Sequence, residues 1–80
     1  MTRELLEEKV IDIIQEVTNE RRIFLNTEFE SLALDSLGMD YIEYLTDQEF
    51  GIVEKKAVWR AFWNRAKTVV DLCNFIENRL

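Results

Sequence analysis

The sequence predicts a small all-α protein, a bundle of four helices with a long loop between the first and second helices. Apolar residues recur at helical spacing in four separate segments, and no segment shows the alternation typical of a strand. Hydrophobic residues make up 48% of the chain, which suits a folded globule better than a disordered tail. With no internal repeat or linker, residues 1–80 are expected to form one domain around a small core.

The first helix is predicted over residues 3–17. Its apolar residues fall on one face, and acidic residues occupy the opposite face. Thr2 is a suitable N-cap, and the polar segment 18–22 ends the helix. The residues expected on the inner face are Leu5, Leu6, Val10, Ile13, Ile14 and Val17.

A long connection follows, over residues 18–34. A connection of this length in a compact domain is expected to pack against the core instead of lying free. Thr27 and Glu30 stand three residues apart and are placed to cap one short helical turn. The apolar residues available for packing are Ile23, Phe24, Leu25, Phe29, Leu32 and Leu34.

The second helix is predicted over residues 36–50. Asp35 is a favourable N-cap, and Gly51 suits the left-handed residue just past a helix end. Gly38 costs up to about 1 kcal/mol relative to alanine, so we expect the start of this helix to fray. The helix carries a broad apolar surface made of Leu37, Tyr41, Ile42, Tyr44, Leu45 and Phe50.

The third helix is predicted over residues 54–67 and is aromatic and basic. Trp59, Phe62 and Trp63 stand at i, i+3 and i+4, the spacing of a buried face; an exposed tryptophan there would instead mark a contact surface. We expect Phe62 to face the core with Val58. Three basic side chains are expected to stay in water: Lys55, Lys56 and Arg60.

The fourth helix is predicted over residues 68–79. Thr68 and Asp71 form a start similar to a capping box, with aspartate in the usual place of glutamate or glutamine. Cys73 is the only cysteine, so the chain has no disulfide framework, and we predict a buried thiol that carries no chemistry. The inward residues are Val69, Leu72, Cys73, Phe75 and Ile76.

Composition and charge exclude several functional classes. The net charge of −6 makes nucleic acids and anionic membranes poor partners. No apolar run approaches the ~20 residues of a membrane span, and we expect no signal peptide before Met1. With no histidine, the chain cannot build a Ser-His or Cys-His nucleophile pair or a metal site that uses histidine. A lone cysteine fits a reducing cytoplasm, so we expect a cytoplasmic protein. We also expect a monomer with no catalytic residues and no metal.

The segment Leu34-Asp35-Ser36-Leu37 holds the candidate functional residue. Ser36 is expected to be the first residue of the second helix, beside free backbone N–H groups and the positive end of the helix dipole. A phosphate ester on its hydroxyl would be favoured there. Asp-Ser is also a common helix start, and on that interpretation the segment has no further function.

Acidic and basic residues are separated along the chain. Residues 23–54 contain eight acids and no base, whereas residues 55–67 contain five bases and no acid. One interpretation is two solvated helix faces that attract each other weakly. The other is an acidic docking face around Ser36 formed by Asp35, Asp40, Glu43 and Asp47, with apolar contacts from Tyr41 and Tyr44.

Together these features resemble the acyl carrier protein family over about residues 5–76. The resemblance rests on Leu34-Asp35-Ser36-Leu37 near the middle of an acidic four-helix domain. It rests also on Glu49-Phe50-Gly51-Ile52 at the end of the second helix, and on Thr68-Val69-Val70-Asp71-Leu72 followed by Phe75-Ile76. None of these motifs is specific to the family when it is taken alone. The resemblance depends on their order and spacing taken together.

The resemblance implies that Ser36 carries a covalent 4′-phosphopantetheine group, added by a phosphopantetheinyl transferase at the site flanked by Asp35 and Leu37. The thiol of this arm carries acyl groups as thioesters. The chain is then a substrate of acyl-loading and acyl-processing enzymes, and is not itself an enzyme. Proteins of the family present acids of the second helix to basic patches on these enzymes, and can open between helices to shelter the acyl chain. The corresponding residues here are Asp35, Asp40, Glu43 and Asp47 for docking, and Ile42, Leu45 and Phe62 for shelter.

Several positions depart from the usual family pattern. Ala33 stands in place of a glycine and Gly38 in place of an acid, while Asp40 and Tyr41 replace an apolar residue and a glutamate. These departures suggest a specialised carrier in a fatty-acid or polyketide-type pathway, with dedicated partners. The alternatives are a peptidyl or D-alanyl carrier protein, and an unmodified acidic helical adaptor that binds another protein.

Overall fold

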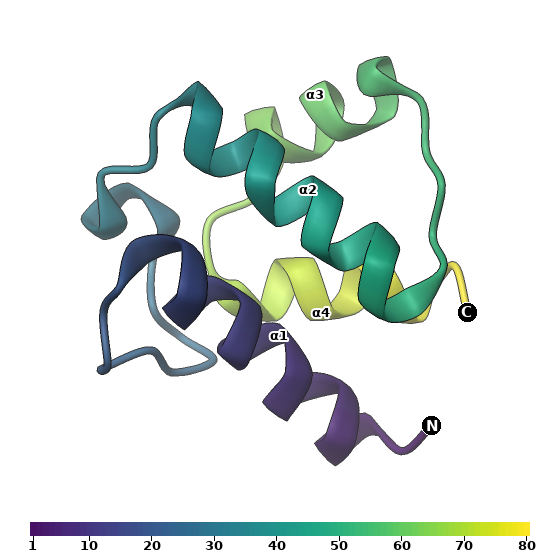
Figure 1. Cartoon of the computed structure of the whole chain (residues 1–80), viewed down its shortest axis with the longest axis horizontal. Helices are drawn as coiled ribbons and strands as arrows, with labels where there is room; N and C mark the ends of the chain where they lie inside the picture. The colour runs from purple at the N-terminus through teal and green to yellow at the C-terminus, as the bar shows by residue number, and fades with distance from the viewer.

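The computed structural model describes all 80 residues and confirms an all-α bundle of four helices with no strand. The helices are α1 (Arg3–Thr18), α2 (Ser36–Phe50), α3 (Lys56–Arg65) and α4 (Val69–Glu77), and a short 3₁₀ turn, η1 (Phe29–Leu32), lies in the long connection. In Figure 1, α2 crosses in front of α4, with α1 below them and α3 above. None of these helices has the length and apolar character needed to cross a membrane.

Helix α1 packs against both α2 and α4. Its start is as predicted: the Thr2 hydroxyl accepts a hydrogen bond from the backbone N–H of Leu5 at 3.2 Å. One predicted core residue is wrong, since Leu5 is 43% exposed at the edge of the apolar face. The side chains that α1 buries are Leu6, Val10, Ile13 and Ile14.

The long connection between α1 and α2 is held against the start of α4 by backbone hydrogen bonds. The N–H groups of Val69 and Val70 donate to the carbonyls of Thr27 and Leu25, at 3.1 and 3.0 Å. The first N–H groups of a helix have no acceptor within it, so the connection supplies the acceptors that α4 lacks. These bonds fix the position of a segment that has little regular structure of its own.

The side chains of the connection divide between core and solvent. Ile23 and Phe29 are buried, which confirms that the segment packs down. Phe24 is 61% exposed, so its prediction as a packing residue was wrong. The predicted turn exists as η1, but Thr27 does not cap it, because its hydroxyl already accepts a hydrogen bond from the N–H of Phe24 at 2.7 Å.

Aromatic side chains attach α3 to the rest of the molecule. The rings of Trp59 and Phe62 are buried and lie 4.7 and 4.8 Å from the Phe75 ring of α4, between centroids. Trp63 is half-buried and meets Phe29 edge to face at 5.2 Å. As predicted, three basic side chains of this region stay exposed: Lys55, Lys56 and Arg60.

Helices α3 and α4 are shorter than the sequence predicted. Residues 51–55 form a non-helical connection, in which Val53 is 84% exposed, and α3 begins at Lys56 instead of residue 54. Helix α4 begins after its cap, Thr68, and directs all five predicted residues into the core: Val69, Leu72, Cys73, Phe75 and Ile76.

Candidate functional site

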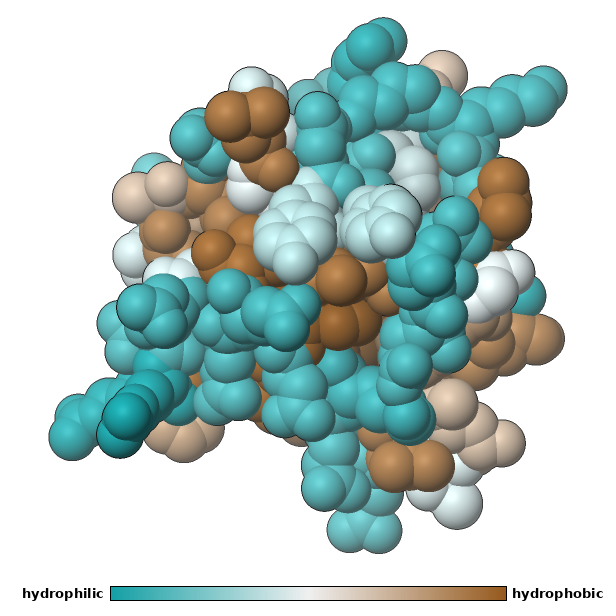
Figure 2. All heavy atoms as spheres, in the orientation of Figure 1, coloured by the Kyte–Doolittle hydropathy of each residue, from teal (hydrophilic) through white to brown (hydrophobic).

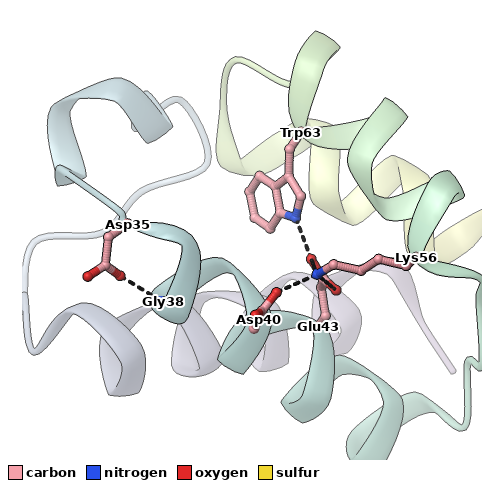
Figure 3. A network of polar contacts seen from close by, with 6 residues as sticks. All are labelled: Asp35, Gly38, Asp40, Glu43, Lys56 and Trp63. Atoms are coloured by element: carbon pink, nitrogen blue, oxygen red, sulfur yellow. Dashed lines mark hydrogen bonds and ion pairs between the residues drawn. The ribbon is translucent and has the colours of Figure 1, made fainter.

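The start of α2 places Ser36 at a capped helix end. The Asp35 carboxylate accepts a hydrogen bond from the N–H of Gly38 at 2.8 Å (Figure 3), as predicted for an N-cap. The N–H groups of Ser36 and Leu37 make no hydrogen bond within the chain, and the Ser36 side chain is exposed. The hydroxyl of Ser36 therefore lies beside two free donors at the positive end of the helix, a setting that favours an anion.

Gly38 lies in the first turn of α2, which begins at Ser36. Its N–H is bound by the cap, and a Cβ added to Gly38 would lie 3.0 Å from Cδ2 of Leu34 and 3.3 Å from Oδ1 of Asp35. A larger residue would push against both side chains. The absence of a side chain at Gly38 thus lets Leu34 and the capping carboxylate close over the first turn of α2.

The apolar surface predicted for α2 divides into an inner and an outer part. Ile42 is fully buried, with Leu45 and Phe50 partly buried against the core. Leu37, Tyr41 and Tyr44 are 76%, 45% and 57% exposed and share the outer face, since they stand at i, i+4 and i+7. The two tyrosine rings are stacked, with centroids 6.4 Å apart. We call Leu37, Tyr41 and Tyr44 the outer stripe.

A cluster of polar side chains connects α2 to α3 (Figure 3). The Glu43 carboxylate accepts hydrogen bonds from Nε1–H of Trp63 at 2.9 Å and from Nζ of Lys56 at 3.0 Å. Lys56 also pairs with Asp40, and these hydrogen bonds, first to Asp40 and then to Glu43, raise the pKa of its ammonium group. We call Asp40, Glu43, Lys56 and Trp63 the α2–α3 bridge.

The α2–α3 bridge changes which acids can meet a partner. The Glu43 side chain is only 12% exposed and is used within the fold, and Asp40 shares Lys56 with it. The Asp35 carboxylate caps α2. Asp47 makes neither an ion pair nor a side-chain hydrogen bond, and is the predicted docking acid that remains free. The ion pairs of Lys56 with Asp40 and Glu43 join the acidic segment to the basic one, as one of the two interpretations of the charge pattern requires.

A groove of about 410 Å³ opens beside Ser36 between α2 and α3. Next to it is an apolar hollow of about 350 Å³, and Met39 and Trp63 line both. The other side chains of the groove are Ser36, Asp40, Glu43, Lys56, Arg60 and Asn64. Besides Met39 and Trp63, the hollow is lined by Phe29, Glu30, Ala33, Leu34 and Ala66.

Sequence reasoning missed the groove, and it did not assign five of the groove's residues to the site: Met39, Lys56, Arg60, Trp63 and Asn64. Helical spacing does place Arg60 and Asn64 on one face of α3, but no pattern in the chain shows that this face meets the start of α2. The residues expected to shelter an acyl chain do not share a hollow. Ile42 is enclosed in the core, while Leu45 and Phe62 line separate surface hollows.

The remaining surface offers little other chemistry. Hydrophilic residues cover most of the face in Figure 2, with apolar residues visible in its centre. No group of three or more acidic or cysteine side chains is arranged to hold a metal ion. Cys73 is fully buried, and burial raises the pKa of its thiol to about 11.

Comparisons of the chain with protein-family models, with curated proteins and with solved structures found no match. The candidate site is therefore defined by geometry. It consists of Ser36 and its free helix-start amides, the groove beside it, and the outer stripe of α2.

Proposed function

We propose that the chain is an acyl carrier protein that bears 4′-phosphopantetheine on Ser36. The observation that carries the proposal is the exposed Ser36 hydroxyl at the capped start of α2, next to the free N–H groups of Ser36 and Leu37. These groups fit a phosphodiester, because they offer two donors and a positive dipole end to its negative charge. Asp35 keeps the first turn formed.

In the proposed modification, the Ser36 hydroxyl oxygen bonds to the pantetheine-bearing phosphorus of coenzyme A. The P–O bond of the pyrophosphate breaks, adenosine 3′,5′-bisphosphate leaves, and the hydroxyl proton passes to a base of the transferase or to solvent. When bound, the arm supplies a thiol that carries acyl groups as thioesters. The chain itself contributes attachment, orientation of the first turn of α2 and a docking surface.

Backbone conformation at two positions supports the resemblance to this family. Ala33 occupies the left-handed region with φ 50°, at the position where the family usually has glycine. Gly51 has φ 68° at the end of α2, as the Glu-Phe-Gly-Ile motif predicts. The left-handed region costs a residue with a side chain about 1–2 kcal/mol. Ala33 adopts this region although it has a side chain, so the backbone at this position has the conformation that glycine favours.

The outer stripe and Asp47 supply the proposed docking surface. Exposed tyrosines beside a free carboxylate suit a partner with an apolar patch surrounded by basic residues. The proposed partners are a phosphopantetheinyl transferase and acyl-loading or acyl-processing enzymes of a fatty-acid or polyketide-type pathway. The same surface suits a peptidyl or D-alanyl carrier, or an unmodified adaptor. As a carrier, the protein would act as a cytoplasmic monomer.

The test is the intact mass after incubation with coenzyme A and a promiscuous phosphopantetheinyl transferase. The wild type should gain one phosphopantetheinyl group, and Ser36→Ala should gain none. Ser31→Ala is the matched control, since Ser31 is also exposed and its hydroxyl only donates to the Glu28 carbonyl. A wild type that stays unmodified while a known carrier domain is modified would reject the proposal in favour of the adaptor.

A further inference from the structure

We infer that the outer side of α3 is a second docking surface, separate from the outer stripe of α2, for a protein partner that presents carboxylates. This inference goes beyond the proposed function and does not depend on it, because it requires no group on Ser36. We call the surface the basic face, and it consists of four cations around two small residues: Lys55, Arg60, Arg65 and Lys67 around Ala57 and Ala61.

The cations of the basic face have no acid within the chain to neutralise them. Six of the ten bases of the chain form no ion pair, and four of these six are the cations of the basic face, all exposed. The acids on either side in the sequence are already engaged, since Glu54 pairs with Arg79 and Asp71 caps α4. A strongly acidic protein therefore presents one positive surface, whose charge is complementary to an acidic partner.

The shape of the basic face suits close contact. Helical spacing places Ala57 and Ala61 in the middle of the exposed side of α3, with Arg60 and Arg65 on either flank. In Figure 1, α3 lies above α2 and α4, on the opposite side of the molecule from α1. Because alanine side chains are short, the surface of a partner can come close to the helix between the two arginines, and both can then reach its carboxylates.

The start of α3 carries charge that does not favour a helix. Lys55 occupies the N-cap position without a side-chain hydrogen bond, and the first turn contains no acid. A cation at the positive end of the helix dipole is destabilising. The other three helices begin instead after good capping residues, Thr2, Asp35 and Thr68. Residues that break a local rule of this kind are typical of functional surfaces.

A protein fits the basic face better than a bilayer or a nucleic acid does. No large apolar side chain between Lys55 and Lys67 is among the exposed ones, so the face has nothing to insert into a membrane. Nucleic acids and anionic bilayers carry dense negative charge, which the net charge of −6 repels. A protein with a local acidic patch meets the basic face alone.

The experiment is a titration of the ¹⁵N-labelled, unmodified protein with a helical peptide that has glutamate at every fourth position. The reference is the same peptide with glutamine in place of glutamate. The amide resonances of α3 should shift with the glutamate peptide only, and less at high salt. Arg60→Gln combined with Arg65→Gln should weaken the binding by about two- to twentyfold, the range for two exposed ion pairs, with an unchanged circular dichroism spectrum.

Arg21→Gln combined with Arg22→Gln is the matched control. These two arginines are also exposed and form no ion pair, but they lie in the connection after α1. The double variant removes the same charge, and should bind the peptide as the wild type does.

Lys55→Asp separates binding from stability. Aspartate is a favourable N-cap, so the variant should have a higher urea midpoint than the wild type. It should nevertheless bind the glutamate peptide more weakly, because it replaces a cation of the basic face by an acid.

The inference fails if the resonances of α3 do not shift, if the two arginine pairs weaken binding equally, or if Lys55→Asp binds as the wild type does. Larger shifts in α3 with phosphatidylserine vesicles or duplex DNA than with the peptide would assign another class of partner and overturn it. Shifts that grow with protein concentration alone would make the partner a second copy, bound through the exposed, unpaired acids of α1: Glu4, Glu8, Asp12 and Glu16. The mass test of Ser36 decides the carrier function separately.

Discussion

Thr46 is a residue whose burial carries a measurable cost. Its side chain is fully buried in α2, and its hydroxyl has no hydrogen-bond partner. A buried donor without a partner costs about 1–3 kcal/mol, whereas an apolar group of the same shape costs nothing of this kind.

Thr46→Val should therefore raise the free energy of unfolding, by about 1 kcal/mol. Urea denaturation followed by far-UV circular dichroism measures the change. Thr18→Val is the control, because the Thr18 hydroxyl donates to the Ile14 carbonyl at 2.7 Å and its removal should not stabilise the protein. A lower midpoint for Thr46→Val would show that the hydroxyl is satisfied in solution.

Cys73 should be unreactive in the folded protein. The thiol is enclosed in the core, and burial raises its pKa to about 11, so the thiolate that reacts with alkylating agents is scarce at neutral pH. Iodoacetamide labelling, followed by mass spectrometry, should be slow in buffer and fast in denaturant. Cys73→Ala should still accept the arm on Ser36. Rapid labelling of the native protein would contradict the burial.

The start of α4 depends on the ionised form of Asp71. Its carboxylate accepts hydrogen bonds from the backbone N–H groups of Thr68, at 3.0 Å, and Lys67, at 2.7 Å. These two bonds, in that order, lower the pKa of Asp71 in the folded state. Because the unfolded chain then binds a proton more readily, ionised Asp71 stabilises the fold above the ordinary aspartate pKa of about 4. This contribution is lost as the pH falls through the lowered pKa of the folded state.

Asp71→Asn should lower the stability at pH 7 by roughly 0.5–1 kcal/mol, the usual range for a charged group at a helix start. The loss should shrink as the pH falls below about 4, since the unfolded wild type is then protonated at Asp71, and the folded wild type is protonated at still lower pH. Thermal unfolding between acidic and neutral pH measures the difference. A gap between the two proteins that stays constant with pH would show that the charge is not what stabilises the start of α4.

For the molecule as a whole, association depends on where the free charges lie. The net charge is −6, yet the α2–α3 bridge uses Asp40 and Glu43 internally. On the proposed docking face this leaves Asp47 as the free acid beside the outer stripe. Surface charges of this kind mainly accelerate encounter, and salt screens them over about 10 Å at 0.1 M.

Modification of Ser36 by the transferase should slow as salt rises, and Asp47→Lys should slow it by roughly three- to tenfold at low salt. Glu8→Lys is the control, because it makes the same change in net charge at an exposed, unpaired position on α1. Initial rates from intact mass measure both effects. Equal slowing in the two variants would mean that only net charge matters and that α2 is not the docking face.

Local signals in the chain were sufficient for the existence of the four helices and for the position of Ser36 at the start of α2. Thr2, Asp35 and Gly51 act at helix ends through contacts with residues one turn away, so their roles can be predicted from sequence spacing. The burial of Cys73 follows in the same way from the periodicity of α4. Such contacts do not depend on how the helices are arranged.

The groove and the α2–α3 bridge depend on the arrangement of the helices. Lys56 meets Asp40 and Glu43 across two helices, and Trp63 donates to Glu43 over a separation of twenty residues. Nothing in the sequence pairs these residues, because their proximity follows from the aromatic packing that seats α3 on Phe75 and Phe29. Whether an acid faces a partner or a lysine of its own chain is thus set by core packing, and the spacing of charges along the chain does not reveal it.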